Sequence, residues 1–318
     1  QNLVITYALQ TALLAPQWCG HEIDVTRRVL QIGAGKAGDI HKYVKCMHML
    51  HEESPSKDAS MLWYLSDPRY DDDDSPLLED VKNRVQQLPE ADSVLLKTCY
   101  LGLGIDDVLQ NQDSRMTGGL THISAMFVLN HVVSSEEKAR FYLQGMYDLL
   151  QPGGWLTLCI TDSDTLCHWQ RAPSDIPIVK ISGTPTKVWG SHYMATIEGD
   201  HTGIEGEHGG IEGVLEYVIP HECFISVARR CGFDSPVMNK NHAGLKSSLY
   251  GYRQCDDKLK QAISKQMHIP RLYRIIMMRR PLSDRNVGKK RKRHDVDGGG
   301  KKAKKAKKAK KAKKAKKA

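Results

Sequence analysis

Apolar and polar residues along the first half of the chain alternate between two periods. Short apolar runs bounded by turn residues predict strands, and apolar residues at three-to-four spacing predict helices. The spacing is clearest at Ala139, Tyr142 and Met146, in a helix that ends at Pro152-Gly153-Gly154. Strands are predicted over residues 28–32, 61–65, 93–98, 121–128 and 155–160, and helices over 2–15, 37–47, 75–87 and 134–149. This alternation predicts an α/β fold with a doubly wound, mostly parallel sheet.

The pattern changes beyond residue 165. Apolar runs separated by Gly- and His-rich turns predict strands over residues 178–183, 187–197 and 213–219. Helices are expected over 221–231 and near 256–266, and a last strand over 273–278. Short connections between successive strands are typical of antiparallel pairing. We therefore expect an antiparallel β layer, at about 165–220, inserted beside the parallel sheet.

Charge divides the chain into two parts that the net value of +9 conceals. Residues 285–318 hold 18 Lys and Arg against 2 acids, whereas residues 1–284 hold 28 basic and 35 acidic residues. An acidic body excludes a fold that is basic throughout. We expect one domain over 1–284 and a disordered basic tail over 285–318. Its cluster Lys289–Arg293 is of the nuclear-import or nucleic-acid type. The Lys-Lys-Ala repeats after it suit attraction to phosphate backbones, or a solubilising appendage.

The eight cysteines form no C-x-x-C pair, and several lie within apolar runs. This usage predicts reduced, mostly buried thiols and a cytosolic, nuclear or cytoplasmic-virus setting. No His/Cys cluster suits a metal, and no apolar run is long enough to span a bilayer.

A glycine-rich turn is the first candidate for chemistry. Gly33-Ala34-Gly35-Lys36-Ala37-Gly38 matches G-x-G-x-x-G between a predicted strand and helix, where glycines let a ligand approach the backbone. The motif fits dinucleotides and also S-adenosylmethionine. No acid ends a strand at the distance that dinucleotide folds use. Asp67, which follows the second strand, is placed to hold a ribose, and Lys36 suits a ligand with a carboxylate. Both features favour S-adenosylmethionine.

Further segments resemble the mRNA cap guanine-N7 methyltransferase family in the order of its motifs. The segment from Val29 to Asp39 resembles its first motif, with Gln31 where that family has an acid. Ile123–His131 resembles the segment that ends in His-Tyr in the family, and Glu216-Tyr217-Val218 and Leu272-Tyr273-Arg274 resemble two late segments that close on the cap. The methyltransferase domain of the poxvirus capping enzyme is the most similar in character. The resemblance covers nearly all of residues 1–280 and implies a class I methyltransferase (Rossmann-like) fold.

The resemblance also implies a role for each motif residue. On the cofactor side, glycines make room for S-adenosylmethionine, a lysine attracts its carboxylate, acids orient the turn and hold the ribose, and an aromatic ring lies along the cofactor or base. These residues are Gly33, Gly35, Lys36, Asp39, Asp67 and Phe127. On the cap side, a carboxylate pairs with the guanine edge, while rings and amides contact the base, sugar or phosphates. These residues are Asn2, Asn130, His131, Glu216 and Tyr273.

The expected activity is methyl transfer to N7 of the terminal guanosine of GpppN-RNA, and a viral enzyme is expected. Guanine N7 has an available lone pair, so catalysis is chiefly alignment and no catalytic side chain is expected. Two alternatives remain open: a class I methyltransferase with another substrate, and an inactive methyltransferase-fold module that tethers nucleic acid. The expected partners are a capped RNA end, nucleic-acid backbone at residues 289–318, and capping-enzyme subunits or domains. The expected location is a virus factory, a virion or the nucleus, with no membrane association.

Overall fold

A computed structural model describes residues 26–53, 60–72, 74–111, 116, 119–171, 179–197, 211–234, 238–241 and 273–282. The predicted helices 2–15 and 256–266 and the basic tail lie outside these residues. The chain divides into two compact units, residues 1–280 and 281–318. The fold and the candidate site described below belong to the first unit.

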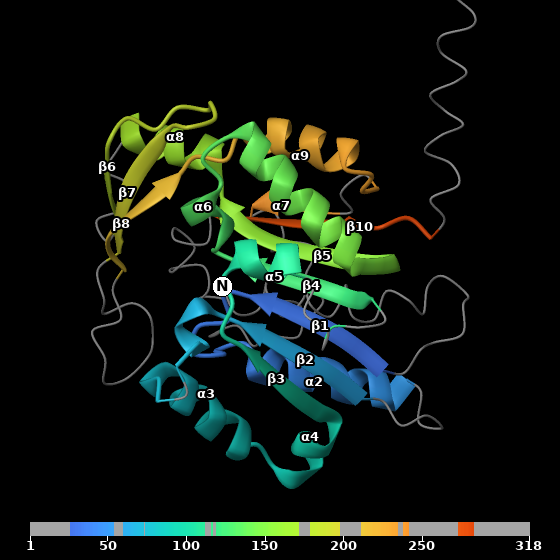
Figure 1. The fold of residues 1–318 in the computed structure, drawn as a ribbon. Coiled ribbons are helices and arrows are strands. Elements are labelled where there is room, and N and C mark those ends of the chain that lie inside the picture. The colour runs from blue at the N-terminus through green and yellow to red at the C-terminus, as the bar shows by residue number, and fades with distance from the viewer. Residues whose placement is uncertain are drawn as a thin grey trace, which may run out of the picture. The chain divides into compact units, whose positions relative to one another are not determined.

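Seven strands form the main sheet, in the order β3-β2-β1-β4-β5-β10-β9 (Figure 1). The first five are parallel, and β10 runs antiparallel to both β5 and β9. Their bounds are β1 Thr26–Ile32, β2 Ser60–Ser66, β3 Leu96–Leu101, β4 Leu120–Met126, β5 Leu150–Thr161, β9 Met238–Asn241 and β10 Tyr273–Arg279. The chain order reverses between β1 and β4, which makes this pair the topological switch point of a doubly wound sheet.

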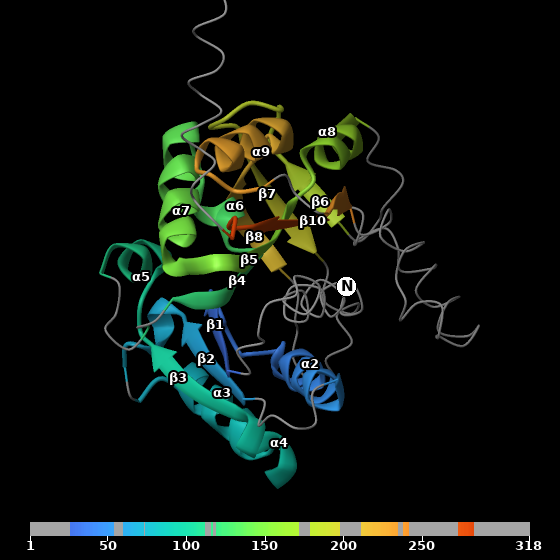
Figure 2. The same ribbon diagram turned by 90° about the vertical axis from the view of Figure 1, so that its right-hand side faces the viewer.

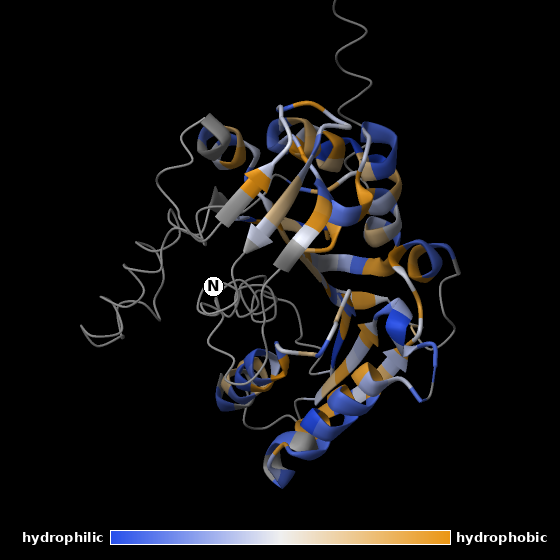
Figure 3. Ribbon diagram, turned by 90° about the vertical axis from the view of Figure 1, so that its left-hand side faces the viewer, coloured by the Kyte–Doolittle hydropathy of each residue, from blue (hydrophilic) through white to orange (hydrophobic). Residues whose placement is uncertain are grey.

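Helices cover both faces of this sheet (Figure 2). One apolar core joins the sheet to α2 and α3, and a second joins it to α5, α7 and α9. Apolar and polar residues are interspersed along the longer helices (Figure 3), and in α7 the buried residues are Ala139, Tyr142, Leu143, Met146 and Tyr147. The helices are α2 Ile40–Glu53, α3 Pro76–Gln86, α4 Glu90–Leu95, α5 Ile105–Asn111, α6 Leu129–Val132, α7 Glu136–Leu149, α8 Ser163–Arg171 and α9 His221–Arg230. The short 3-10 helix η2 spans Pro68–Tyr70.

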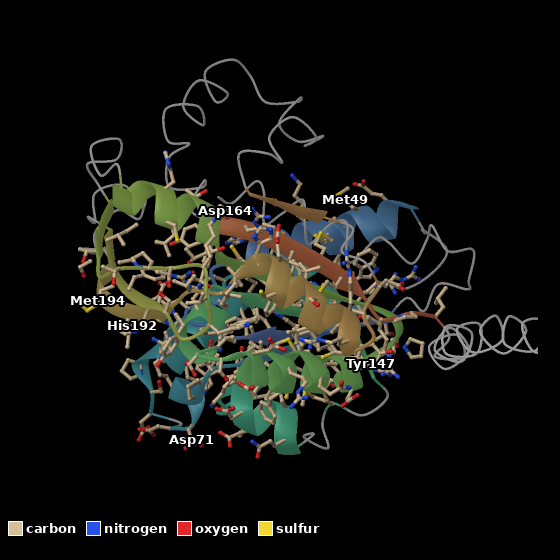
Figure 4. The ribbon with its side chains drawn as sticks, turned by 90° about the horizontal axis from the view of Figure 1, so that it is seen from above. Met49, Asp71, Tyr147, Asp164, His192 and Met194 are labelled. Carbon is tan, nitrogen blue, oxygen red and sulfur yellow. The ribbon has the colours of Figure 1, made fainter. Side chains whose placement is uncertain are left out.

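A separate sheet of three antiparallel strands, β6-β7-β8, follows α8. Its strands are β6 Val179–Ser182, β7 His192–Ile197 and β8 Ile211–Tyr217. Along β7 the side chains alternate, so that Tyr193 is buried while His192 and Met194 lie at the outer surface (Figure 4). The structure thus confirms the predicted Rossmann-like, mostly parallel sheet with an inserted antiparallel layer.

Two predicted strands begin too early: the strand predicted over 187–197, of which β7 covers only His192–Ile197, and the strand predicted over 93–98. The sequence predicts a strand over 93–98, but α4 continues to Leu95 and β3 begins at Leu96. Glu90 and Asp92 lie in the first turn of α4, where the positive end of the helix dipole favours acids. The sequence pattern also did not predict α5. Its apolar residues Ile105, Val108 and Leu109 lie among polar residues, so the helical period is weak.

Candidate functional site

The glycine turn adopts a backbone that requires glycine at its start. Gly33 and Gly35 have φ of 66° and 51°, in the left-handed region. A Cβ at Gly33 would lie 2.4 Å from Cγ2 of Val128, which follows the end of β4. A bare backbone is therefore needed where β1 passes β4. The Ala34 amide donates to the Ser66 carbonyl at 3.0 Å, which fixes the turn against the end of β2.

Asp67 lies directly after β2 and contacts the same turn. Its carboxylate is buried and accepts from the Gly35 amide at 3.0 Å. Burial alone would raise the pKa of this carboxyl, but hydrogen bonds from Arg69 and from the amides of Arg69 and Gly35 outweigh it and lower the pKa. Asp67 is therefore an anion next to the glycine turn. The Tyr70 hydroxyl donates to the Gly35 carbonyl and holds the opposite side of the turn.

The other predicted cofactor residues of this region have partners within the fold. The exposed ammonium of Lys36 lies 3.8 Å from an Asp80 carboxylate oxygen. Asp39, just before α2, accepts from the Lys42 ammonium and, at 3.3 Å, from the side-chain amide nitrogen of Gln31. The buried Gln31 Oε1 has no hydrogen-bond partner among the described residues.

Phe127, directly after β4, has an unusual backbone conformation. Its φ is 62°, a left-handed conformation that a bulky residue rarely adopts. The Phe127 backbone amide donates to the Cys159 carbonyl at 3.0 Å. The Phe127 ring forms a T-shaped pair with the Tyr273 ring, with 4.7 Å between the ring centroids. The strained conformation turns the ring toward β10. Such outliers gather at functional sites, and here one coincides with a predicted site residue.

Glu216, on β8, is buried beside the carboxyl end of β5. Its Oε2 accepts from the Tyr193 hydroxyl and lies 3.2 Å from the Thr161 hydroxyl. Tyr193 stands directly opposite Glu216 in the small sheet, and Tyr273 stands opposite Thr161 in the main sheet. Within the part of the chain that is described, no hydrogen bond reaches Glu216 Oε1. One carboxylate oxygen is anchored and the other is available.

The tyrosines of this cluster are neutral. Burial, and next the negative charge of Glu216, raise the pKa of Tyr193 above the ordinary value. The same two causes raise the pKa of Tyr273. Their hydroxyls therefore keep their protons and act as donors near neutral pH.

Asn130 and His131 sit in α6, just beyond Phe127, and have different surroundings. Asn130 is buried: its amide nitrogen donates to the Tyr217 carbonyl at 3.2 Å, and its oxygen accepts from the Thr161 amide at 3.1 Å. It thereby ties β8 to β5 and has a structural role in addition to any contact with a ligand. The exposed His131 ring lies 3.5 Å from the Leu215 carbonyl. The predicted residue Asn2 lies outside the described residues.

The structure thus places ten of the eleven predicted site residues. Nine of them lie after strand ends or on the small sheet beside them, and Tyr273 is the first residue of β10. The ends of β1, β2 and β4 lie in register at Ile32, Ser66 and Ala125. Sequence reasoning missed Tyr193, Thr161 and Arg69. Strand alternation could have marked Tyr193, because it lies on the buried face of β7. Nothing in the sequence marks Arg69, whose role depends on a side chain that folds back on Asp67.

A charged cluster borders the site at the start of β10. Asp162 is buried and accepts from Arg274 at 2.9 and 2.7 Å, and its other oxygen accepts from the amides of Asp164 and Thr165 in the first turn of α8. Asp164, at the surface in Figure 4, pairs with Lys187. These contacts fix α8 to the sheet edge and need no ligand.

Among the described residues, no group of His, Cys, Asp or Glu is arranged to hold a metal ion. No helix within the described ranges is long and apolar enough to cross a membrane. Cys46, Cys159, Cys167 and Cys231 are buried free thiols, as predicted, whereas Cys223 is exposed.

No family model and no curated protein matches the sequence. Among solved structures, the CcbJ methyltransferase from Streptomyces caelestis is 13% identical with a TM-score of 0.44, over 85% of this chain and 94% of that one. A SAM-dependent methyltransferase from Methanosarcina mazei is 12% identical with a TM-score of 0.45, over 82% and 95%. The glycopeptide N-methyltransferase MtfA, complexed with S-adenosyl-L-methionine, is 9% identical with a TM-score of 0.43, over 86% and 94%.

Proposed function

We propose that the chain is an S-adenosylmethionine-dependent methyltransferase. The support is the carboxyl edge of the sheet, where the glycine turn, the Asp67 carboxylate and the Phe127 ring follow neighbouring strands at the switch point. In open α/β sheets this is where ligands bind. The bare backbone at Gly33 and Gly35 suits a closely approaching ligand, and Asp67 is the ionised acceptor that ribose hydroxyls require. Lys36 and Asp39 border the turn and would meet the amino-acid end.

When bound, S-adenosylmethionine supplies an electrophilic methyl group. The contribution of this chain is to hold and orient that group and the acceptor. The rings of Phe127 and Tyr273 form a T-shaped pair that would border the methyl group and the acceptor. Rings that exclude water would strengthen the electrostatic interactions inside the site.

For the acceptor we propose N7 of the terminal guanosine of capped RNA. The single observation that carries this choice is Glu216, a buried carboxylate with one oxygen anchored by Tyr193. A carboxylate accepts from guanine N1–H and the exocyclic amine, and no other base presents that pair of donors on one edge. Burial raises the pKa of Tyr273, and this residue is close enough for the charge of Glu216 to raise it further. His131 lies near the carbonyl of the neighbouring Leu215, and Asn130 positions the strand.

No general base is assigned, because guanine N7 needs no deprotonation before it attacks. The neutral hydroxyls of Tyr193 and Tyr273 are in keeping with this chemistry, since neither is poised to remove a proton. Alignment is the main requirement, and a small misplacement of either reactant lowers the rate steeply.

A methyl-transfer assay tests the proposal. The full chain is incubated with labelled S-adenosylmethionine and RNA that ends in GpppG, beside the same RNA ending in a triphosphate. We expect label only in the capped RNA. Glu216→Gln is expected to lose transfer by at least tenfold while it keeps cofactor affinity, and Glu222→Gln, a change at an exposed glutamate of α9, is expected to keep both. Equal loss of cofactor affinity in Glu216→Gln would contradict the role given to Glu216.

One observation favours a second candidate, a methyltransferase fold that binds nucleic acid without catalysis. Asp67 is already paired with Arg69, so the ribose acceptor is engaged. Failure of the wild-type chain to bind the cofactor in calorimetry would favour this module. Label in RNA of both kinds would instead favour a methyltransferase with another substrate.

The basic tail completes the proposal for partners. Its lysines would attract the RNA backbone without reading sequence, while the edge of the sheet selects the capped end. Capping-enzyme subunits are further proposed partners. The same tail suits a nuclear protein or one that stays with nucleic acid in a virus factory or virion.

A further inference from the structure

The carboxylate of Asp67 is saturated by donors of its own chain. Oδ1 accepts from the Arg69 amide at 3.1 Å and from Arg69 Nε at 2.8 Å. Oδ2 accepts from the Gly35 amide at 3.0 Å and from Arg69 Nη2 at 2.9 Å. An ionised carboxylate has about four lone-pair positions. Four donors leave none for a ligand.

Two of these donors are fixed and two are displaceable. The amides of Gly35 and Arg69 belong to the backbone of the glycine turn and of η2. The Arg69 side chain is 65% exposed, whereas that of Asp67 is 4% exposed, so the guanidinium covers the carboxylate from the solvent side. Among the described residues the guanidinium hydrogen-bonds only to Asp67. Water competes for the exposed guanidinium, so its two hydrogen bonds are given up more easily than those of the two backbone amides.

The guanidinium also borders the turn. Its Nη2 lies 3.7 Å from the position that a Cβ at Gly35 would take, which is an ordinary van der Waals distance. The arginine therefore occupies the acceptor Asp67 and leaves the bare backbone at Gly35 open beside it.

The pair of N–H donors that Arg69 directs at Asp67, called the fork from here on, matches the donors of a ribose. Arg69 presents two N–H donors side by side, one to each carboxylate oxygen. The 2′,3′-diol of a ribose presents two neighbouring O–H donors. Exchange of the fork for the diol keeps four hydrogen bonds on Asp67 and leaves both backbone donors in place. Nothing but the arginine side chain has to move.

We propose that Arg69 is a displaceable internal competitor for the ribose diol of an adenosyl ligand, and that it sets the affinity of the cofactor site. The inference rests on the proposed function, because it takes the diol-bearing ligand from there. Binding frees the guanidinium, and the free enzyme keeps Asp67 covered. The affinity for the cofactor is lower than an uncovered carboxylate would give.

Calorimetric titration of the full chain with S-adenosylhomocysteine tests this. We expect Arg69→Ala to bind up to about fivefold more tightly than the wild type, the effect of removing from the free state one ion pair whose cation is exposed. Arg69→Lys, which cannot form the fork, is expected between the two. Arg230→Ala is the matched control, because it removes another exposed arginine pair, that of Arg230 with Glu136 between α9 and α7. It is expected to bind as the wild type does.

A 2′,3′-dideoxy analogue of the same ligand separates competition from a general change in charge. Without the diol no exchange takes place, so Arg69→Ala and the wild type are expected to bind it equally. Equal or weaker binding of S-adenosylhomocysteine by Arg69→Ala, while the wild type binds, would overturn the inference and leave the proposed function standing. Absence of binding in every variant would overturn both.

A titration of the Asp67 carboxyl by NMR follows the pair without any ligand. Because Arg69 lowers the pKa of Asp67, Arg69→Ala is expected to raise it toward its usual range, and Arg230→Ala is expected to leave it unchanged. An unchanged Asp67 pKa in Arg69→Ala would show that the fork does not form in solution, and would overturn the inference.

Discussion

Gly33 is required at its position by two independent constraints at once. Its φ of 66° suits glycine, and Val128 leaves no room for a side chain. Gly38, in the same motif, has no positive φ, and a Cβ there would meet no described atom within 4 Å. The two glycines of one sequence pattern therefore differ in what they contribute, and only the first is fixed by the packing of β1 against the end of β4.

Gly33→Ala is expected to lower the free energy of unfolding by about 2 kcal/mol or more, through backbone strain and the overlap with Val128. Gly38→Ala, the matched control, is expected to change it by less than about 1 kcal/mol or to stabilise slightly. Urea unfolding measures both. Equal effects would contradict the packing described for the turn.

His122 lies in the middle of β4 and is fully buried. Burial lowers its pKa from 6.5 to about 3, so the ring is neutral in the folded chain, and its Nε2 lies 2.9 Å from the Thr157 hydroxyl. In the unfolded chain the ring gains a proton below its ordinary pKa. The unfolded state therefore binds more protons between about pH 6.5 and about pH 3, and stability falls as the pH is lowered through that interval.

Replacement of His122 is expected to remove this part of the pH dependence. At pH 5 the wild type has lost about 2 kcal/mol from this group relative to pH 7. His122→Gln should reduce the difference in the free energy of unfolding between pH 7 and pH 5 by that amount. The variant itself should be less stable than the wild type at pH 7. His192→Gln, at an exposed histidine, should keep the wild-type difference. An unaltered pH dependence in His122→Gln would contradict the neutral buried ring.

At the scale of elements, the small antiparallel sheet carries Glu216 and Tyr193 and must be held against the main sheet. Asn130 does this, because it joins the Tyr217 carbonyl of β8 to the Thr161 amide of β5. Asn130→Ala leaves both backbone groups without that partner. The expected loss is about 2 kcal/mol, since buried polar groups lose their hydrogen bonds.

Hydrogen exchange measures this loosening locally. In Asn130→Ala the amides of β8 and the Thr161 amide should exchange faster than in the wild type, while those of β1 and β2 should not. Gln144→Ala is the control, because its bond to Asp148 lies on the exposed side of α7. Faster exchange throughout the sheet would mean that Asn130 supports the whole fold and not this junction.

The elements were largely predictable because local patterns determine them. The turns that end the strands depend on residues next to one another in the sequence. The start of helix α7, where the Ser135 hydroxyl accepts from the Lys138 backbone amide, does so too. The candidate site was predictable in composition but not in geometry. The left-handed Phe127, the Tyr193–Glu216 pair and the Arg69 fork each depend on contacts between segments far apart in sequence or on a rotamer, which periodicity does not encode.

At the scale of the whole molecule, the proposed function assigns selection of the RNA end to the acidic body and attraction of the RNA backbone to the basic tail. Residues 1–284 have seven more acids than bases, and residues 285–318 have sixteen more bases than acids. An acidic body repels a long RNA, so the affinity for its backbone would come from the tail. Each phosphate contact that is lost lowers the salt dependence of binding.

Deletion of residues 289–318 is expected to weaken binding to a long capped RNA at least tenfold at low salt and to flatten the dependence of affinity on salt concentration. Activity on a short cap analogue should remain at the level of the full chain. Binding isotherms at several salt concentrations, beside rates on the analogue, provide both readouts. Loss of activity on the analogue would mean that the tail belongs to the site.

The most direct test of the central claim is the position of the transferred methyl group. After incubation of the full chain with labelled S-adenosylmethionine and GpppG-ended RNA, the RNA is digested to nucleosides and the labelled species is identified. The account predicts that the label is in 7-methylguanosine from the cap. Label in any other nucleoside, or none in RNA while the cofactor binds, would contradict it.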